Sequence, residues 1–341
     1  MAVLSRTANG LRERKPLLPG VARATKPIRE AHGIARGMLW AGAVITGFFI
    51  VLGLFAQWIS PYKFSEYSSN GVRFPQLAHP SAKHWMGTTV QSSDVMARVI
   101  WGAQTELKVV VIALVMALSV GVPLGLISGY FGGALDRALV LIMDALFAFP
   151  YLLFAIVIAF LLANSSIGQG VLTAAIAITV AYVPLYFRVV RNHVISVREE
   201  PYVDAARALG ARPRTIIRKY IFFNVVQNVP PIATLNAADA ILLLAALGFL
   251  GYGIQPSQGA EWGYDINRAV SDASSGIWWT GLFPGLAIVL LVTGLTLLGE
   301  GLNETINPVL RRRRFGRFEF VEAPSPGAID IEPLAEEPEQ S

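Results

Sequence analysis

The sequence predicts an all-α integral membrane protein with six transmembrane helices and both termini in the cytoplasm. Of its 341 residues, 54% are hydrophobic and only 15% are charged, whereas soluble domains carry about 25% charged residues. Six apolar stretches are long enough to cross a hydrocarbon core about 30 Å thick. Lysine and arginine cluster on alternate connections between these stretches. The chain contains no cysteine, which excludes disulfides and thiolate metal sites.

The first predicted span lies too far from the N-terminus, and its apolar run is too long, for a cleaved signal peptide. No small-residue cleavage site follows it, so we interpret it as a retained anchor. Each of the six stretches contains about 20 residues or more. The predicted spans are Gly37–Ile59, Leu107–Gly129, Ala138–Ala163, Ile167–Val189, Val226–Leu250 and Ile277–Leu302.

Basic residues set the predicted orientation, because cytoplasmic connections are enriched in lysine and arginine. The connection "NSSIGQG" after the third span has none, and the connection after the fifth has only Arg268. The basic charge is therefore a topology signal, and we do not expect nucleic acid as a partner. The basic residues are Arg6, Arg12, Arg14, Lys15, Arg23, Lys26, Arg29 and Arg36 before the first span, Arg188, Arg191, Arg198, Arg207, Arg212, Arg214, Arg218 and Lys219 after the fourth, and Arg311, Arg312, Arg313 and Arg314 after the sixth.

This topology divides the chain into three parts. Residues 1–36 form a basic cytoplasmic tail that can approach anionic lipid headgroups. Residues 37–310 form the transmembrane domain, with a first external loop at 60–106 and a long cytoplasmic loop at 190–224. Residues 311–341 are basic, then acidic and proline-rich, and their composition predicts a disordered tail.

The cytoplasmic loop after the fourth span contains "PYVDAARALGARPRTIIRKY", residues 201–220. Pro201 suits a first helical turn, and Gly210 suits the left-handed position that ends a helix. Pro213 can begin a second helix, so the pattern predicts two short helices joined by a tight turn.

The first of these helices has a small face, Ala205, Ala206 and Leu209, flanked by Asp204 and Arg207. Small side chains allow close approach, so this helix could fit a groove on a partner protein. A helix lying on the lipid headgroups explains the same pattern equally well.

Asp204-Ala205-Ala206, with Gly210 after it, resembles the Glu-Ala-Ala loop of ABC-importer membrane subunits. "HPSAKHWMGTT", "DALFAFPYLLFAI", "FLGYGIQP" and "LFPGLAIVLLVTGLTLLGEGLNETINP" extend the resemblance from about Gly37 to Arg311. Together they are similar to the dipeptide, oligopeptide and nickel permease family, in particular its second, C-type membrane subunit.

The resemblance implies a pore-forming subunit of a binding-protein-dependent importer, with peptides as expected substrates and nickel or another small solute as alternatives. Residues 201–210 would be a coupling helix, in which Asp204, Ala205, Ala206, Leu209 and Gly210 meet the ATPase. Implied partners are a second homologous membrane subunit, two ATP-binding subunits that hold ATP and Mg, and an external solute-binding protein. Implied localisation is the plasma membrane of a bacterium or archaeon, the inner membrane in a Gram-negative cell.

The chain itself contains no P-loop, because none of its six lysines follows a glycine. We therefore expect a non-catalytic subunit that binds no cofactor of its own. A membrane enzyme is disfavoured by the lack of Ser/Lys, paired-Asp or His-metal patterns. An ion-coupled secondary transporter remains an alternative, although no inverted repeat is evident.

Two acids lie deep in predicted spans, Asp144 in the third and Asp239 in the fifth. Acidic side chains there usually face a bundle interior or a water-filled path. We expect Asp239, Asn236 and Asp144 to line the translocation pathway; a purely interhelical hydrogen bond is the alternative. Gly121, Gly125 and Gly129 in the second span form a ridge expected to pack closely on another helix.

Overall fold

The computed structural model describes residues 34–69, 71–163 and 170–306, and this part of the chain is almost entirely helical. The two predicted tails therefore lie outside the described residues, apart from residues 34–36 at the start of the first helix. One small departure from the all-α prediction is an antiparallel hairpin of β1 (Ser68–Ser69) and β2 (Val72–Arg73) in the first external loop.

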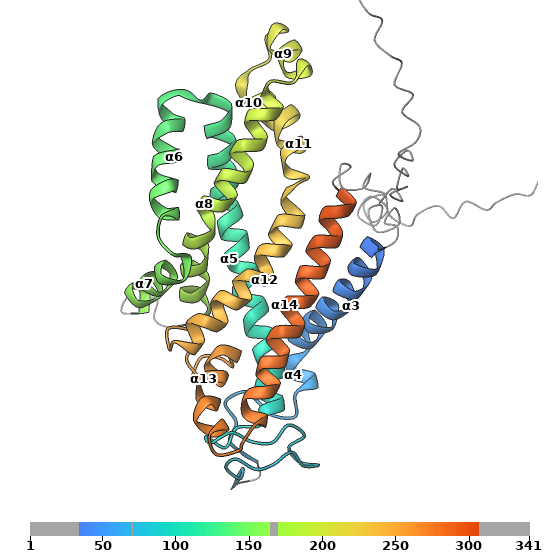
Figure 1. Cartoon of the computed structure of the whole chain (residues 1–341), viewed down its shortest axis with the longest axis vertical. Coiled ribbons are helices and arrows are strands. Elements are labelled where there is room, and N and C mark those ends of the chain that lie inside the picture. The colour runs from blue at the N-terminus through green and yellow to red at the C-terminus, as the bar shows by residue number, and fades with distance from the viewer. Residues whose placement is uncertain (1–33, 70, 164–169, 307–341) are drawn as a thin grey trace, which may run out of the picture.

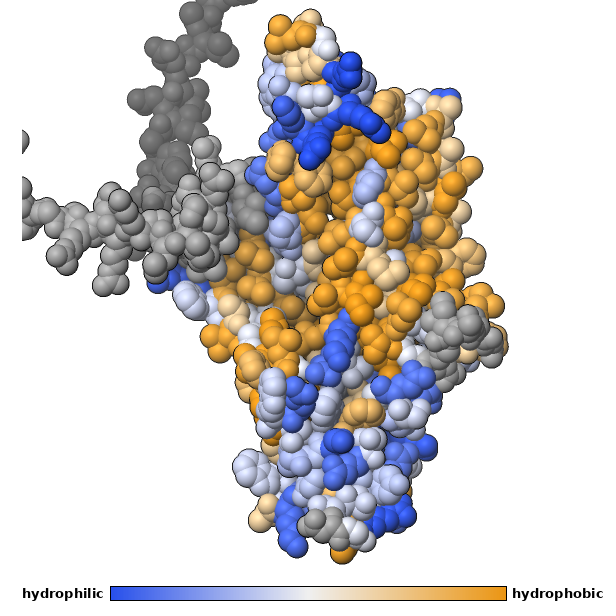
Figure 2. All heavy atoms as spheres, turned by 180° about the vertical axis from the view of Figure 1, so that it is seen from behind, coloured by the Kyte–Doolittle hydropathy of each residue, from blue (hydrophilic) through white to orange (hydrophobic). Residues whose placement is uncertain are grey.

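Within the described residues, five helices are long and apolar enough to cross a membrane, and a sixth span results if α6 and α7 are counted as one. Hydrophobic side chains cover the middle of the face in Figure 2, with hydrophilic ones at both ends. These helices are α3 (Ile34–Leu54), α5 (Val95–Phe131), α6 (Gly133–Phe147) with α7 (Tyr151–Ala163), α8 (Val171–Arg198), α12 (Val229–Phe249) and α14 (Trp279–Ile306).

Shorter helices lie at the two ends of the molecule (Figure 1). The predicted cytoplasmic loop contains α9 (Pro201–Ala208), α10 (Pro213–Thr215), the π-helix η1 (Ile216–Ile221) and α11 (Phe222–Val226). Toward the end opposite α9 (Figure 1), α4 (Ala56–Ile59) follows α3, and α13 (Trp262–Ala273) lies between α12 and α14 in the chain.

The third span is not the single straight helix that the sequence predicts. α6 and α7 meet at 90°. Pro150 lies at the break, where it has no N–H to donate and disfavours helical geometry at Phe149. The bend turns the chain sideways within the membrane region before α8 begins.

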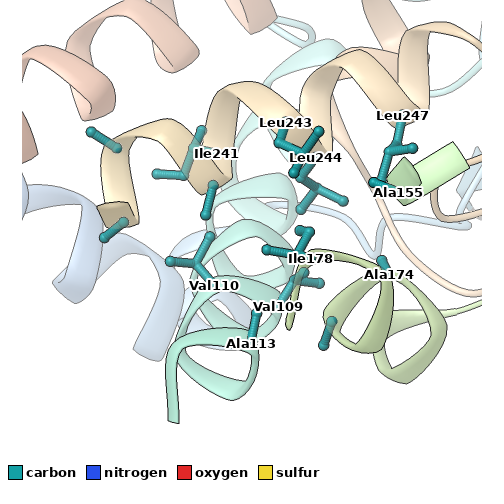
Figure 3. Close-up of a cluster of buried hydrophobic side chains, with 14 of the residues drawn as sticks. Val109, Val110, Ala113, Ala155, Ala174, Ile178, Ile241, Leu243, Leu244 and Leu247 are labelled. Atoms are coloured by element: carbon teal, nitrogen blue, oxygen red, sulfur yellow. The ribbon is translucent and has the colours of Figure 1, made fainter. Parts of the chain in front are cut away.

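The core forms where α5, α7, α8 and α12 meet (Figure 3), through side chains such as Val109, Ala155, Ile178 and Leu244. The predicted glycine ridge is confirmed, and it packs on α8. A Cβ added at Gly121, Gly125 or Gly129 would lie only 2.8 Å from atoms of α8. The missing side chains let α5 and α8 approach closely and form the central helix pair.

Candidate coupling loop and translocation face

The segment that contains α9 forms one extreme end of the molecule, at the top of Figure 1. Pro201 occupies the first turn of α9, and Gly210 ends it with a φ of +77°. This positive φ is the left-handed conformation that favours glycine. Leu209 is 88% exposed, an unusual position for a leucine on a polar end of a protein. Asp204 and Ala205 are exposed as well.

Ala206 does not share this outer face, which corrects the expectation of a single patch made of Ala205, Ala206 and Leu209. Residues three apart lie on the same side of a helix, so Ala206 joins Val203 on the inner side. Both are buried, Val203 at 0% and Ala206 at 6% exposure. Val203 belongs to a second apolar cluster that anchors the loop: Leu126, Val190, Val194, Val203, Ile216, Ile221, Val225 and Val229.

Polar contacts also fix α9 relative to the end of α5. Arg207 donates to Asp204 at 2.8 Å and lies over the ring of Tyr130, 5.7 Å from its centroid. At the end of α8, Arg198 donates to the carbonyl oxygen of Gly129 at 2.9 Å. The segment between α8 and α12, residues 199–228, is what we call the coupling loop. It is held by both helices of the central pair.

A bidentate ion pair links α6 to α8 close to this loop. Arg191 donates two hydrogen bonds to Asp136, at 2.6 and 2.7 Å, and Ser128 on α5 donates to the same carboxylate. Three helices thus converge on one acid. The sequence alone gives no sign of which arginine Asp136 meets.

Asp144 lies where α6 approaches α8 and forms an ion pair with Arg188 at 2.7 Å. The Arg188 guanidinium also lies over the ring of Phe147, 4.2 Å from its centroid. The pair remains about half exposed, at 52% for the acid and 41% for the arginine. Such a pair facing lipid would be costly, so this side of α6 and α8 is suited to water or protein.

Asp239 is exposed on α12. Helix α12 contacts both α7, which begins at Tyr151, and α8. Tyr151 also lines a recess of about 300 Å³ together with Phe147. The exposed Asp239, the Asp144–Arg188 pair and this aromatic recess make up the candidate surface that we call the translocation face: Asp144, Phe147, Phe149, Tyr151, Phe154, Arg188 and Asp239.

Asn236 lies three residues before Asp239 on α12, but its side chain is buried. It is 6% exposed and is positioned beside the Tyr186 hydroxyl, which is itself buried at 1% exposure. A buried amide beside a buried hydroxyl suits contact between helices α12 and α8. Asn236 and Asp239 are three residues apart and so lie on the same side of α12, with Asn236 at its packed edge and Asp239 exposed.

Sequence analysis alone misses a buried charged cluster at the outer end. Arg98 on α5 donates to Asp265 on α13 at 2.7 Å, and His84 meets Asp94 at 2.8 Å. Because the cluster joins residues up to 167 positions apart, only a predicted helix at α13 could have signalled it.

Comparisons with known proteins agree on one family. Residues 121–312 match the family model described as "Binding-protein-dependent transport system inner membrane component". The dipeptide transport system permease protein DppC of Alkalihalophilus pseudofirmus is 37% identical over 293 residues, 84% of this chain and 92% of the relative. The glutathione transport system permease protein GsiD of Pectobacterium atrosepticum is 31% identical over 274 residues, 79% of this chain and 87% of the relative.

The fold is also similar to a solved structure titled "Inward facing conformations of the MetNI methionine ABC transporter". The TM-score is 0.51 at 19% identity, with 62% of this chain and 98% of that chain covered. At this identity the likeness concerns the fold alone.

Proposed function

Because the chain belongs to the family of binding-protein-dependent transport system inner membrane components, we propose that it forms half of the translocation pathway of an ABC importer. A second, homologous membrane subunit supplies the other half. An external solute-binding protein delivers the substrate, and two ATP-binding subunits hold ATP and Mg. The present chain is the non-catalytic permease subunit, in the plasma membrane of a bacterium or archaeon and in the inner membrane where two membranes exist.

In the proposed topology, α6 and α7 count as one of six spans, and both termini are cytoplasmic. The position of α9 at one end supports this orientation, because Arg198, Arg207 and Arg212 lie at that same end. Cytoplasmic ends of membrane proteins are the ones enriched in arginine and lysine.

The coupling loop is the proposed docking site for an ATP-binding subunit. Asp204, Ala205, Leu209 and Gly210 supply the exposed surface, and Ala206 holds it in place from beneath. The observation that carries this proposal is Leu209, an 88% exposed leucine on a loop that is anchored from its other side. Burying that leucine in a partner would recover roughly 1.5–3 kcal/mol of hydrophobic free energy.

The translocation face is the proposed surface past which the substrate moves. Its exposed acids and aromatic rings suit a solute with a cationic amino group, because carboxylates pair with ammonium and aromatic faces attract cations. Asn236 contributes to this pathway by holding α12 against α8, so that Asp239 keeps its exposed position.

Short peptides are the proposed substrates. The relatives' names, dipeptide and glutathione transport permeases, support this class, and the acids of the translocation face fit the amino end of a peptide. Nickel or another small solute remains the second possibility within the same importer type.

The docking proposal is tested with Leu209→Asp in the complete importer. A charge in place of the exposed leucine should reduce copurification of the ATP-binding subunits by about tenfold, which corresponds to 1.4 kcal/mol. Val72→Asp is the matched control, because Val72 is 70% exposed in the external hairpin. Full copurification of the ATP-binding subunits with Leu209→Asp would refute docking at this loop.

A further inference from the structure

Two glutamates from distant parts of the chain meet at the outer end of the molecule. Glu106 lies on α5 and Glu261 directly precedes α13, and both are 0% exposed. Both carboxylates reach consecutive backbone N–H groups at the start of α13. Glu261 caps α13, since its two oxygens accept the backbone N–H groups of Gly263 and Tyr264, each at 2.7 Å. Glu106 accepts the N–H of Trp262 at 3.4 Å.

Glycines make the site too tight for water to reach the pair from the neighbouring helices. A Cβ at Gly248 on α12 would overlap a carboxylate oxygen of Glu261, and one at Gly102 on α5 would overlap the Trp262 ring. The Trp262 ring is itself 0% exposed and donates to the carbonyl oxygen of Val99 at 3.1 Å. We call this contact of α5, α12 and α13 around Trp262 the outer joint.

No described cation neutralises the pair. On α5, Arg98 is engaged by Asp265 through its Nη2 at 2.6 Å, and the exposed Lys108 donates to Gln104 at 2.8 Å. Asp265 acts on both glutamates with the same sign of charge, and Arg268 on α13 points into solvent. On α12 the single charged residue is Asp239, more than two turns away from Gly248.

One oxygen of Glu106, Oε2, is buried and receives no hydrogen bond. An ionised carboxylate can only accept hydrogen bonds, so two ionised carboxylates in contact cannot satisfy each other. Two like charges that are buried close together, away from water, also repel strongly. Adding one proton removes both the repulsion and the missing hydrogen bond, because a protonated carboxyl group is neutral and donates to the other carboxylate.

We propose that Glu106 and Glu261 bind a single proton between them and that this proton fastens α13 to α5 and α12. The outer joint is then a proton-binding site in addition to its packing. Burial, and secondarily the charge of Asp265, raises the pKa of Glu261 to about 8, although the two backbone N–H groups act in the opposite direction. A glutamate in an unfolded chain has a pKa of about 4.3.

The sign of the pH effect follows from this difference. A raised pKa means that the folded state binds more protons than the unfolded state between about pH 4 and about pH 8. The stabilisation is therefore complete below the lower value and is lost as the pH rises through the upper one. Acidic surroundings keep the outer joint closed, and alkaline surroundings loosen it.

The experiment measures the melting temperature of the intact importer complex between about pH 6 and about pH 9, for the parent protein and for Glu106→Gln. The parent should lose stability as the pH rises. The amide of the Glu106→Gln variant donates to Glu261 at every pH and favours its ionised form, so the variant should lose stability at a lower pH than the parent does. Glu66→Gln is the matched control, because the Glu66 carboxylate makes only an exposed contact with Lys63.

Infrared spectroscopy provides a second readout that does not depend on the variant's folding. The C=O stretch of a protonated carboxylic acid should be present in the parent at neutral pH and should disappear at alkaline pH. An absent band, a loss of stability at the parental pH in Glu106→Gln, or stabilisation that follows sodium concentration at fixed pH would each overturn the proposal. These outcomes leave docking at Leu209 unaffected, so the two proposals fail separately.

Discussion

Charged side chains inside this protein fall into two groups that differ in their partners. Arg98 with Asp265 and Arg191 with Asp136 are matched pairs whose hydrogen bonds connect helices. Asp239 forms no ion pair with any residue that the structure describes, and its exposed position leaves it available to a solute. Its isolation, more than its acidity, makes it the leading candidate for contact with substrate.

Asp239→Asn keeps the size of the side chain and removes its charge. Hydrogen bonds to charged groups contribute about 1.5–3 kcal/mol, so uptake of a labelled dipeptide into proteoliposomes should fall at least about tenfold. Copurification of the ATP-binding subunits should stay unchanged, since α9 lies at one end of the molecule and α12 lies in its middle (Figure 1). Glu304→Gln near the end of α14 serves as the control. Uptake at the parental rate would remove Asp239 from the pathway.

At the scale of elements, the glycine ridge of α5 determines how closely this helix approaches α8. A Cβ at Gly125 would lie 2.8 Å from the carbonyl oxygen of Phe187, and backbone atoms cannot move aside as a flexible side chain can. By contrast, a Cβ at Gly47 on α3 would meet nothing within 4 Å. Glycines in two spans therefore have very different structural roles.

Gly125→Val should force α5 away from α8 and lower the stability of the protein by about 1–3 kcal/mol or more, the usual cost of overpacking. Gly47→Val inserts the same side chain into another span and should have little effect. Thermal unfolding in detergent measures both. Equal melting temperatures for the two variants would contradict the assigned role of the ridge.

The sequence predicts the membrane class, the positions of most spans, the glycine ridge and the two short helices of the cytoplasmic loop, because each depends on local composition or spacing. It fails at the outer end of α5. Predicted to begin at Leu107, this helix begins at Val95, capped by Asp94, whose side chain accepts the N–H of Ala97 at 2.7 Å. Residues 95–106 of the predicted external loop 60–106 are therefore helical.

The physical reason is long-range pairing. Arg98 and Glu106 look like loop residues in sequence, yet both are buried against α13. α13 itself escapes prediction because it is too short and polar for a span. The site divides in the same way: Asp204 and Leu209 are evident from a local motif, whereas Arg188 and Glu261 require knowledge of which helices touch.

At the scale of the whole molecule, the absence of cysteine makes the proposed topology directly testable. Ser65 in the external loop and Ala208 in the coupling loop are both exposed. In intact cells a membrane-impermeant maleimide should label Ser65→Cys, and it should label Ala208→Cys only after permeabilisation. The parent chain is the unlabelled control. Labelling of Ala208→Cys from outside would invert the proposed orientation.

α5 reaches both ends of this molecule without a break in its helix. Its 37 residues, at 1.5 Å per residue, make a rod about 55 Å long, with Pro123 as its one internal proline. Tilting such a rod by about 5° displaces its far end by about 5 Å. The same tilt, taken about the end of α5 that lies near the coupling loop, would shift Gly102 and Glu106 by more than the diameter of a water molecule. Leverage of this kind needs no chain of intermediate contacts: the length of one helix provides it.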